Sequence, residues 1–295
     1  MDRRTYLRNT SLATAGLLSL GPWQTLAALA ANNRYRSDIG IQLYTLRGPL
    51  KKDAAATMQE VAKLGYQQGE LYNFPNCEPL ISAARAAGLT LNSSHIAWAS
   101  VTNPSDAAMS DFQGLVERAN AVGLSHLVIP FLGAHERKDL DAYRKVVDHC
   151  NQAASIAKEA GIQLSYHNHS FEFQPMDGGI SGFDVMRERF APEMQFEVDV
   201  FWVAAAGLDP VPLLKELKGR VSQLHLKDLK APSAPPIYSN MPKSAFKELG
   251  NGMIAMEPII QAAEAIGVAH CHVEQDHSPD PLNSIRQSMA YLQNL

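Results

Sequence analysis

A repeated unit of helix, glycine and strand is the feature of this sequence that most restricts its fold. Six stretches with helical periodicity end at a glycine and continue at once into a short apolar run, at Gly65, Gly88, Gly123, Gly161, Gly219 and Gly267. Glycine adopts the left-handed conformation that ends a helix at little steric cost, so it turns the chain into the next strand. A single glycine of this kind is weak evidence for any fold. Six before six strand-like runs indicate stacked β–α units and a parallel sheet.

The strand-like runs number eight, and this number bears on whether the sheet is open or closed. They lie at 39–44, 67–71, 90–95, 126–131, 163–167, 195–199, 222–226 and 269–274, and helices are expected at 53–64, 106–122, 140–160, 210–218, 254–266 and 284–292. Eight β–α units in about 260 residues match the size and order of a closed (β/α)8 barrel. A doubly wound open sheet often has a glycine-rich phosphate loop after its first strand, whereas here that strand runs into Leu43-Tyr44-Thr45. We therefore predict an α/β fold, a single (β/α)8 TIM barrel.

The first thirty residues have the organisation of an export signal. A basic start with Arg3-Arg4 is followed by an apolar stretch without charges and by Ala28-Leu29-Ala30, which are the three parts of a cleavable signal peptide. The arginine pair resembles a twin-arginine signal. A buried N-terminal helix would not explain the missing charges, and Gly21-Pro22 shortens the apolar run below the length of a membrane anchor. We predict a signal peptide at 1–30, a barrel domain at 31–295 and a periplasmic location.

Charge and cysteine content restrict the partners and the compartment. The net charge is −4, from 26 Lys+Arg and 30 Asp+Glu, which argues against the broad basic surface of a nucleic-acid-binding protein. The three cysteines, Cys77, Cys150 and Cys271, are too few for a disulfide scaffold and cannot all pair within one chain. We expect no nucleic-acid partner, membrane contact only during export, and at least one buried, inert cysteine.

Polar side chains stand at the ends of four consecutive predicted strands. In a (β/α)8 barrel the active site lies at the C-terminal ends of the strands. Side chains alternate along a strand, and the opposite faces are apolar, so His167, Asp199, His225 and Glu274 are expected to point inward. Two imidazoles and two carboxylates suit one divalent metal ion: Mn²⁺, Co²⁺ or Zn²⁺, with Mg²⁺ as a further candidate. Each residue could instead be a hydrogen-bonded core residue, but four in register on neighbouring strands favour the metal.

Further residues surround this predicted centre. Glu70 ends the second strand, His95 ends the third, and Tyr44 lies near the end of the first, while His169 and Trp202 follow the fifth and sixth strands. We expect Tyr44, Glu70, His169 and Trp202 to contact a polyhydroxylated ligand. A surface or capping role is the alternative for Glu70, and simple packing is the alternative for Trp202.

The segment 230–252 is the longest without clear periodicity. It contains four prolines and ends in Leu249-Gly250-Asn251-Gly252. A long loop inside a compact domain is usually functional, so we expect this one to lie over the barrel mouth. A disordered excursion is the alternative.

At these residues the sequence resembles the xylose isomerase-like TIM-barrel superfamily, the group usually called sugar phosphate isomerases/epimerases. The most specific segments are Tyr166-His167-Asn168-His169, Asp199, His225-Leu226-Lys227-Asp228, Gly250-Asn251-Gly252 and Val273-Glu274. The resemblance covers essentially the whole chain after the predicted signal. It implies one divalent metal ion held by strands five to eight, and substrate contacts at Glu70 and His95.

The chain departs from this family at one position. Ketose epimerases of the group usually carry glutamate where this chain has His167, and a pair of metal-bound glutamates moves the proton. Here only Glu274 remains of that pair. The departure leaves metal binding intact, because histidine is an equally good ligand. Related barrels include lyases and hydratases that act on keto-sugars, and these are a serious alternative.

The predicted function is therefore a metal-dependent sugar isomerase or epimerase. A sugar hydrogen next to a carbonyl becomes acidic when a metal stabilises the resulting enediolate, and a general base then removes it. Glu274, or else His95, is the candidate base, and Lys227 could donate a hydrogen bond to the developing oxyanion. Reprotonation gives an isomer or epimer. Expulsion of a neighbouring oxygen would instead make the enzyme a lyase or hydratase acting on a keto-sugar such as a 3-keto-glycoside.

Two rival classes share some of these features. Endonuclease IV-like repair enzymes have this fold and its metal chemistry, but the negative charge of this chain argues against DNA. A periplasmic sugar-binding protein without catalytic activity would be two-lobed with a hinge cleft, unlike a single barrel. The expected partner is a small sugar or keto-sugar, together with a second copy of the chain if the protein is a homo-oligomer. We expect the sugar to be unphosphorylated, since no arginine-lined phosphate site is evident near the strand ends.

Overall fold

The structure, a computed structural model, describes residues 38–102, 112–230 and 234–295. All three ranges belong to the predicted barrel domain. The predicted signal peptide at 1–30 lies outside these residues.

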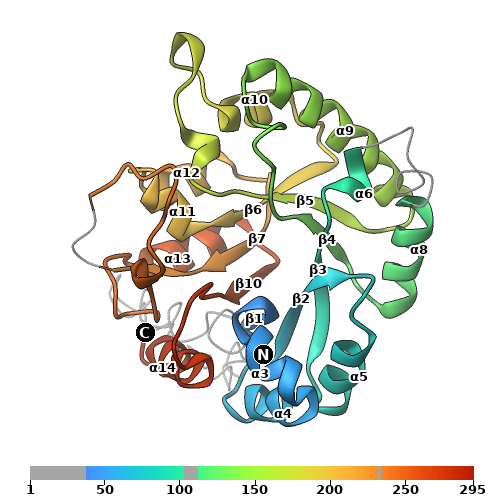
Figure 1. The fold of residues 1–295 in the computed structure, drawn as a ribbon, viewed down its shortest axis with the longest axis vertical. Coiled ribbons are helices and arrows are strands. Elements are labelled where there is room, and N and C mark those ends of the chain that lie inside the picture. Colours follow the sequence, from blue (N-terminus) through green and yellow to red (C-terminus); the bar gives the residue numbers. More distant parts are fainter. Residues whose placement is uncertain (1–37, 103–111, 231–233) are drawn as a thin grey trace, which may run out of the picture. The chain divides into compact units, whose positions relative to one another are not determined.

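Eight parallel strands close into a barrel in the order β1-β10-β7-β6-β5-β4-β3-β2, as Figure 1 shows. The barrel strands are β1 (Gly40–Gln42), β2 (Gln68–Phe74), β3 (Thr90–Ile96), β4 (His126–Ile129), β5 (Gln163–His167), β6 (Met194–Asp199), β7 (Val221–Leu226) and β10 (His270–Val273). This confirms the predicted (β/α)8 barrel. Because β5, β6, β7 and β10 are consecutive neighbours in the ring, their C-terminal ends lie side by side.

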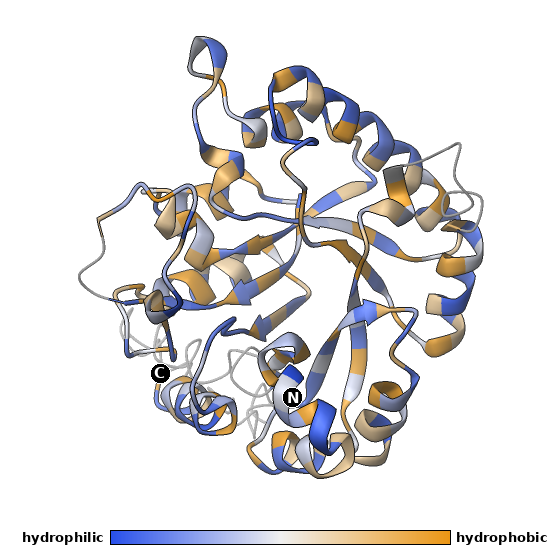
Figure 2. Cartoon of the chain, viewed as in Figure 1, coloured by the Kyte–Doolittle hydropathy of each residue, from blue (hydrophilic) through white to orange (hydrophobic). Residues whose placement is uncertain are grey.

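Helices surround the ring of strands (Figure 1). They are α3 (Arg47–Lys52), α4 (Ala54–Lys63), α5 (Glu78–Ala86), α6 (Ala99–Thr102), α8 (Phe112–Val122), α9 (Leu140–Glu159), α10 (Gly182–Arg189), α11 (Val200–Ala205), α12 (Pro210–Glu216), α13 (Met256–Ile266) and α14 (Pro281–Gln293). Each helix carries both hydrophobic and hydrophilic residues, which are orange and blue in Figure 2. In α9, for example, Val146, Val147, Cys150 and Ala154 are buried. Such amphipathic helices bury one face against the strands and leave the other in water.

The glycines of the repeat behave as expected. All six have positive φ angles, from 77° at Gly161 to 102° at Gly65. The fifth strand has the predicted bounds, and α4 begins after Asp53, whose side chain accepts a hydrogen bond from the N–H of Ala56. The predicted helix at 106–122 is seen from Phe112 onward, because its first residues lie outside the described part of the chain.

The first strand is shorter than predicted. It ends at Gln42, and residues Leu43–Leu46 form a 3-10 helix, η1. The Gln42 side chain accepts a hydrogen bond from the Tyr44 N–H at 3.0 Å, which turns the backbone out of the strand. Tyr44 therefore stands on a helical turn at the rim of the barrel and not on the strand itself.

The long segment after β7 contains structure that the sequence pattern did not indicate. Strand β8 (Asp228–Leu229) pairs antiparallel with β9 (Phe246–Lys247), and a short 3-10 helix, η4 (Lys243–Ala245), precedes β9. The Asp228 carboxylate accepts hydrogen bonds from the N–H groups of Leu229, Gly250, Gly252 and Ile254 at 2.8–3.0 Å. A Cβ atom at Gly252 would lie 2.2 Å from Asp228 Oδ1, so this position requires glycine. One buried carboxylate thus holds the end of the segment in place.

The three cysteines are buried and form no disulfide. Burial raises the pKa of Cys77 to about 11, so its thiol stays protonated at neutral pH. This confirms that at least one cysteine is buried. Within the described part of the chain, none of the helices has the length and apolar character needed to cross a membrane.

Candidate active site

A cavity of about 520 Å³ lies at the C-terminal ends of the barrel strands. Its size is typical of a site for a small molecule. Seven predicted site residues line it: Tyr44, His95, His167, His169, Trp202, Lys227 and Glu274. The other three, Glu70, Asp199 and His225, do not line it and have no exposed surface.

The four predicted metal ligands lie together: His167 and Glu274 line this cavity, and Asp199 and His225 are buried beside them. Nitrogen and oxygen atoms of His167, Asp199, His225 and Glu274 all lie within 4.8 Å of one another; we call these residues the pocket group. His167 Nε2 is 3.3 Å from Asp199 Oδ2, and His225 Nδ1 is 2.9 Å from Glu274 Oε2. The barrel register places Asp199 of β6 beside His225 of β7. The strand-end pattern therefore identified residues that meet in space.

The donor set of the pocket group fits a divalent cation. Two imidazole nitrogens and two carboxylate oxygens are the ligands that Zn²⁺, Co²⁺ and Mn²⁺ accept. A cationic group already bridges the two carboxylates: Lys227 Nζ lies 2.9 Å from Asp199 Oδ2 and 2.7 Å from Glu274 Oε2. These oxygens thus form a place that attracts positive charge.

Lys227 carries its charge although it is almost wholly buried. Burial alone would lower the pKa of this lysine, but the carboxylates of Asp199, Asp276 and Glu274 outweigh it and hold the pKa well above the usual range. Burial likewise acts to raise the pKa of Asp199, and the attraction of Lys227 and His167 brings it down to about 2. The pocket group therefore contains two ionised carboxylates that face a protonated amine.

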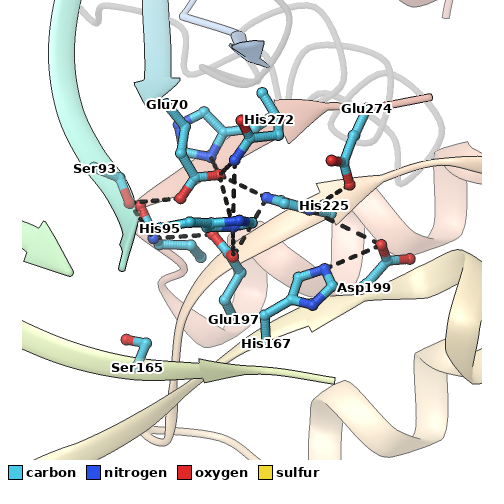
Figure 3. Close-up of polar contacts among 12 residues, drawn as sticks. Glu70, Ser93, His95, Ser165, His167, Glu197, Asp199, His225, His272 and Glu274 are labelled. Atoms are coloured by element: carbon cyan, nitrogen blue, oxygen red, sulfur yellow. Dashed lines mark hydrogen bonds and ion pairs between the residues drawn. The ribbon is translucent and has the colours of Figure 1, made fainter. Parts of the chain in front are cut away.

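A second group of acids and histidines lies deeper in the barrel and shares His225 with the first. Glu70, Glu197, His225 and His272 also have ligand atoms within 4.8 Å of one another; we call them the inner group. Figure 3 shows the His225 ring between Glu70 and His272 on one side and Asp199 and Glu274 on the other. His225 Nε2 lies 2.6 Å from Glu70 Oε2 and 3.3 Å from Glu197 Oε2. None of these four residues lines the cavity.

Carboxylates of both groups surround His225. Burial would lower the pKa of His225, but Glu197, Glu274 and Glu70 raise it well above the usual range. A carboxylate that accepts from one ring nitrogen fixes the tautomer and leaves the other nitrogen free to act as a ligand. Glu70 is placed to do this for His225, with Nδ1 turned toward the pocket group.

Sequence reasoning missed Glu197 and His272, although a signal was present. Glu197 lies two residues before Asp199 on β6, and His272 of β10 lies two residues before Glu274, which directly follows that strand. The alternation that turns the ligand inward therefore turns these residues inward as well.

His95 joins the inner group to the cavity. Its Nε2 lies 3.2 Å from Glu197 Oε2, and its ring stacks on the His225 ring with centroids 5.5 Å apart. Burial would lower the pKa of His95, but Glu70 and Glu197 together raise it. Because His95 also lines the cavity, it is placed to exchange a proton with a ligand bound there.

Aromatic side chains form the upper wall of the cavity. Tyr44 and Phe131 remain 38% and 48% exposed, and Trp202 packs against His169 with ring centroids 4.8 Å apart. Burial and the nearby His167 and Lys227 lower the pKa of His169 well below the usual value, so this imidazole is neutral. Apolar walls above a polar floor suit a sugar, which has both apolar and hydroxylated faces.

The match to a family model settles the family. A model described as xylose isomerase-like TIM barrel matches residues 58–295. The chain belongs to this family. The resemblance inferred from the strand-end residues of this xylose isomerase-like barrel is thereby confirmed. A search among curated proteins found no significant match.

Solved structures share the fold of this xylose isomerase-like barrel. A sugar phosphate isomerase/epimerase from Parabacteroides distasonis is 25% identical with a TM-score of 0.72, over 86% of this chain and 97% of the other. The probable 3-DHS dehydratase AsbF from Bacillus anthracis is 14% identical with a TM-score of 0.67, over 87% and 99%. The IOLI protein, with a zinc atom, is 14% identical with a TM-score of 0.64, over 87% and 95%. At 14% identity the last two show the fold alone.

Proposed function

We propose that this protein is a divalent-metal-dependent sugar isomerase or epimerase that abstracts a proton next to a carbonyl. The observation that carries the proposal is the pocket group itself: His167, Asp199, His225 and Glu274 converge, and two of them, His167 and Glu274, line a cavity of about 520 Å³. The family of the chain and its 25% identity to a structure described as a sugar phosphate isomerase/epimerase support the same reaction class.

One ion of Zn²⁺, Mn²⁺ or Co²⁺, with Mg²⁺ as a weaker candidate, would be held by the four residues of the pocket group. The zinc atom of the IOLI structure supports this choice of cofactor class. When bound, such an ion supplies positive charge that stabilises negative charge developing on a sugar oxygen. The remaining work falls to side chains of the protein.

Two side chains are candidates for the proton transfer. Glu274 is ionised, since Lys227 and His225 hold its pKa well below the usual range against the effect of burial, and it lines the cavity. His95 also lines the cavity, and its Nε2 forms a hydrogen bond with the Glu197 carboxylate. Lys227 lines the same cavity and would donate a hydrogen bond to the sugar oxygen on which charge develops. We assign base and acid roles to Glu274 and His95, and the oxyanion contact to Lys227.

A keto-sugar lyase or hydratase, acting for example on a 3-keto-glycoside, is the second candidate. It is favoured by His167, which stands where two-glutamate ketose epimerases carry glutamate. The fold is also that of a probable dehydratase. Of the two metal-bound glutamates of such epimerases only Glu274 is present here, and it lines the cavity together with the histidine His95. Abstraction of one proton followed by loss of a neighbouring oxygen needs no second carboxylate.

A substrate screen distinguishes the two reactions. Purified protein with added Mn²⁺, Co²⁺ or Zn²⁺ is incubated with free, phosphorylated and 3-keto sugars in D₂O. Unchanged product mass apart from deuterium indicates isomerisation or epimerisation, and loss or gain of water or an alcohol indicates lyase or hydratase chemistry. Glu274→Gln should abolish turnover, whereas Glu257→Gln on the exposed face of α13 should not. Lack of conversion of every sugar by metal-loaded protein would contradict both candidates.

We also propose that the protein is exported to the periplasm through the arginine pair Arg3-Arg4. Replacing both arginines by lysine should leave the protein in the cytoplasmic fraction, while the unaltered protein should be periplasmic. Equal distribution of the two proteins between the fractions would contradict export by this route.

A further inference from the structure

A second recess opens beside the active-site cavity. It has a volume of about 450 Å³ and shares two lining residues, Asp276 and His277, with the cavity. Its other polar side chains include Arg47, Lys243, Ser244 and Ser278. A ligand that reaches past Asp276 and His277 would therefore touch both spaces.

Arg47 is held in place by groups that leave its charge uncompensated. Its two guanidinium hydrogen bonds go to main-chain oxygens, of Tyr44 and of Asp276, both at 2.8 Å. The guanidinium also lies 4.0 Å from the centroid of the Tyr44 ring. A fixed guanidinium with donors to spare is well suited to bind an oxyanion, because little side-chain entropy is lost on binding.

The lining of the recess is positively charged. Within the described parts of the chain, neither Arg47 nor Lys243 forms an ion pair with a carboxylate. The one acidic side chain of the lining, Asp276, is already held by Lys227 Nζ, which lies 3.1 and 3.3 Å from its two carboxylate oxygens. Burial and then Lys243 and Arg47 lower the pKa of His277, so the field of both cations reaches this ring.

We infer that the recess binds a negatively charged group of the substrate, a carboxylate, phosphate or sulfate, while the reacting sugar lies over the pocket group. This inference rests on the proposed function, because one ligand is taken to fill both spaces. If the negatively charged group is a phosphate, the inference replaces the expectation of an unphosphorylated sugar. That expectation considered only the strand ends, whereas Lys243 comes from the distant segment before β9.

The test measures binding of matched neutral and charged sugars. Metal-loaded full-length protein is titrated by calorimetry with glucose, glucuronate and glucose 6-phosphate, and with inorganic phosphate and sulfate alone. We expect at least one charged sugar to bind about tenfold more tightly than glucose, a preference that weakens as salt is added. Comparison of the two charged sugars shows whether a carboxylate or a phosphate is preferred, and competition by phosphate or sulfate shows that the anion alone occupies the recess.

Variants locate this preference. Lys243→Met, alone and combined with Arg47→Met, should reduce binding of the charged sugar by about tenfold or more and leave glucose binding within about twofold. Lys51→Met and Lys52→Met remove the same charge from exposed positions of α3 outside the recess and should change nothing. The single Lys243→Met variant remains informative if loss of the Arg47 hydrogen bonds disturbs the fold.

Two results would overturn the inference. One is equal binding of glucose and both charged sugars, or of none of them, by the unaltered protein. The other is a preference for charge that survives in the double variant. If the protein converts neutral sugars efficiently and does not bind charged sugars more tightly than glucose, the inferred anion site is wrong and the proposed function still holds.

Discussion

The pocket group and the inner group have the same chemical composition but different access to ligands. Each contains two carboxylates and two histidines, with His225 in common, and in each the ligand atoms lie within 4.8 Å of one another. His167 and Glu274 of the pocket group line the active-site cavity, whereas no member of the inner group does. The inner group is also enclosed by partners: Glu70 accepts from Gln42 and Ser93, and Glu197 accepts from Gln223.

This difference indicates a division of labour. A group that a ligand can reach is placed to bind the cofactor and to react, while a buried group whose carboxylates accept internal hydrogen bonds is placed to orient the first. His225 connects the two groups directly, because its Nδ1 contacts Glu274 of the pocket group and its Nε2 contacts Glu70 of the inner group. Substitutions in each group can show whether the two differ in this way.

The largest expected effect is loss of the metal from the pocket group. Asp199 and Glu197 form a matched pair, because both are fully buried carboxylates of β6 and stand two residues apart. We expect Asp199→Asn to lower the metal content from about one ion per chain to nearly none, since a neutral amide is a poor ligand. Metal analysis after dialysis measures the content. In Asp199→Asn the amide oxygen can still accept the Phe201 and Trp202 N–H bonds that the carboxylate accepts, so the helix cap is kept.

Glu197→Gln is the control for this comparison. It removes the same charge from the inner group, and we expect it to leave the metal content near one ion per chain. Equal loss of metal from both variants would contradict the division between the two groups.

A buried carboxylate outside both groups gives the next largest effect. Glu172 accepts hydrogen bonds from the Tyr166 hydroxyl and the His169 N–H, and burial raises its pKa to about 7 from 4.5. The raised pKa means that folding favours the protonated acid. Its contribution to stability is therefore complete below about pH 4.5 and is lost as the pH rises through about 7, a loss of about 3 kcal/mol.

Glu172→Gln should remove this pH dependence, because its amide mimics the protonated acid and does not titrate. Relative to the unaltered protein, the variant should gain stability between pH 4.5 and pH 8, measured as the free energy of unfolding in urea at several pH values. Glu159→Gln, at an exposed position of α9, is the control and should show no such trend. A difference between Glu172→Gln and the unaltered protein that stays constant with pH would contradict the assignment.

The sequence predicts the pocket group better than its surroundings, and the reason is physical. Alternation along a strand shows which side chains point inward, and strand ends mark the level of the active site, so the pattern alone predicted the four residues of the pocket group. Contacts across the barrel depend on register and on closure of the ring. Glu70 and His225 are 155 residues apart and meet only because the ring brings their inward side chains together. Arg47 and Lys243 are likewise far apart in the sequence and both line the recess, the first at the start of α3 and the second at the start of η4 in the segment without clear periodicity.

Glu70 gives a sharper test of the inner group. Its carboxylate lies 2.6 Å from His225 Nε2, and removing such a carboxylate behind a ligating histidine typically weakens metal affinity by about 10- to 100-fold. We expect Glu70→Gln to weaken metal binding by this amount while full occupancy is still reached at high metal concentration. Glu78→Gln, an exposed position on α5, should have no effect. Unchanged affinity in Glu70→Gln would show that the inner group does not act on the pocket group through His225.

The smallest expected effect, and the one of opposite sign, concerns Lys227. Its ammonium contacts Asp199 Oδ2 and Glu274 Oε2, two oxygens that a metal ion in the pocket group would also need. A positive charge at this distance repels the ion and competes for its ligands. We expect Lys227→Met to tighten metal binding by about tenfold, measured by calorimetry, because a neutral side chain of similar shape leaves both carboxylates to the metal.

Asp276→Asn should weaken metal binding, because Asp276 is a third carboxylate that holds the Lys227 ammonium and its loss leaves the ammonium to Asp199 and Glu274. Lys51→Met removes an equal charge at an exposed position of α3 outside the cavity and should leave the affinity nearly unchanged. Weaker metal binding in Lys227→Met would contradict this expectation. It would mean that the Lys227 ammonium orders the carboxylates of Asp199 and Glu274 for the metal and does not compete with the ion.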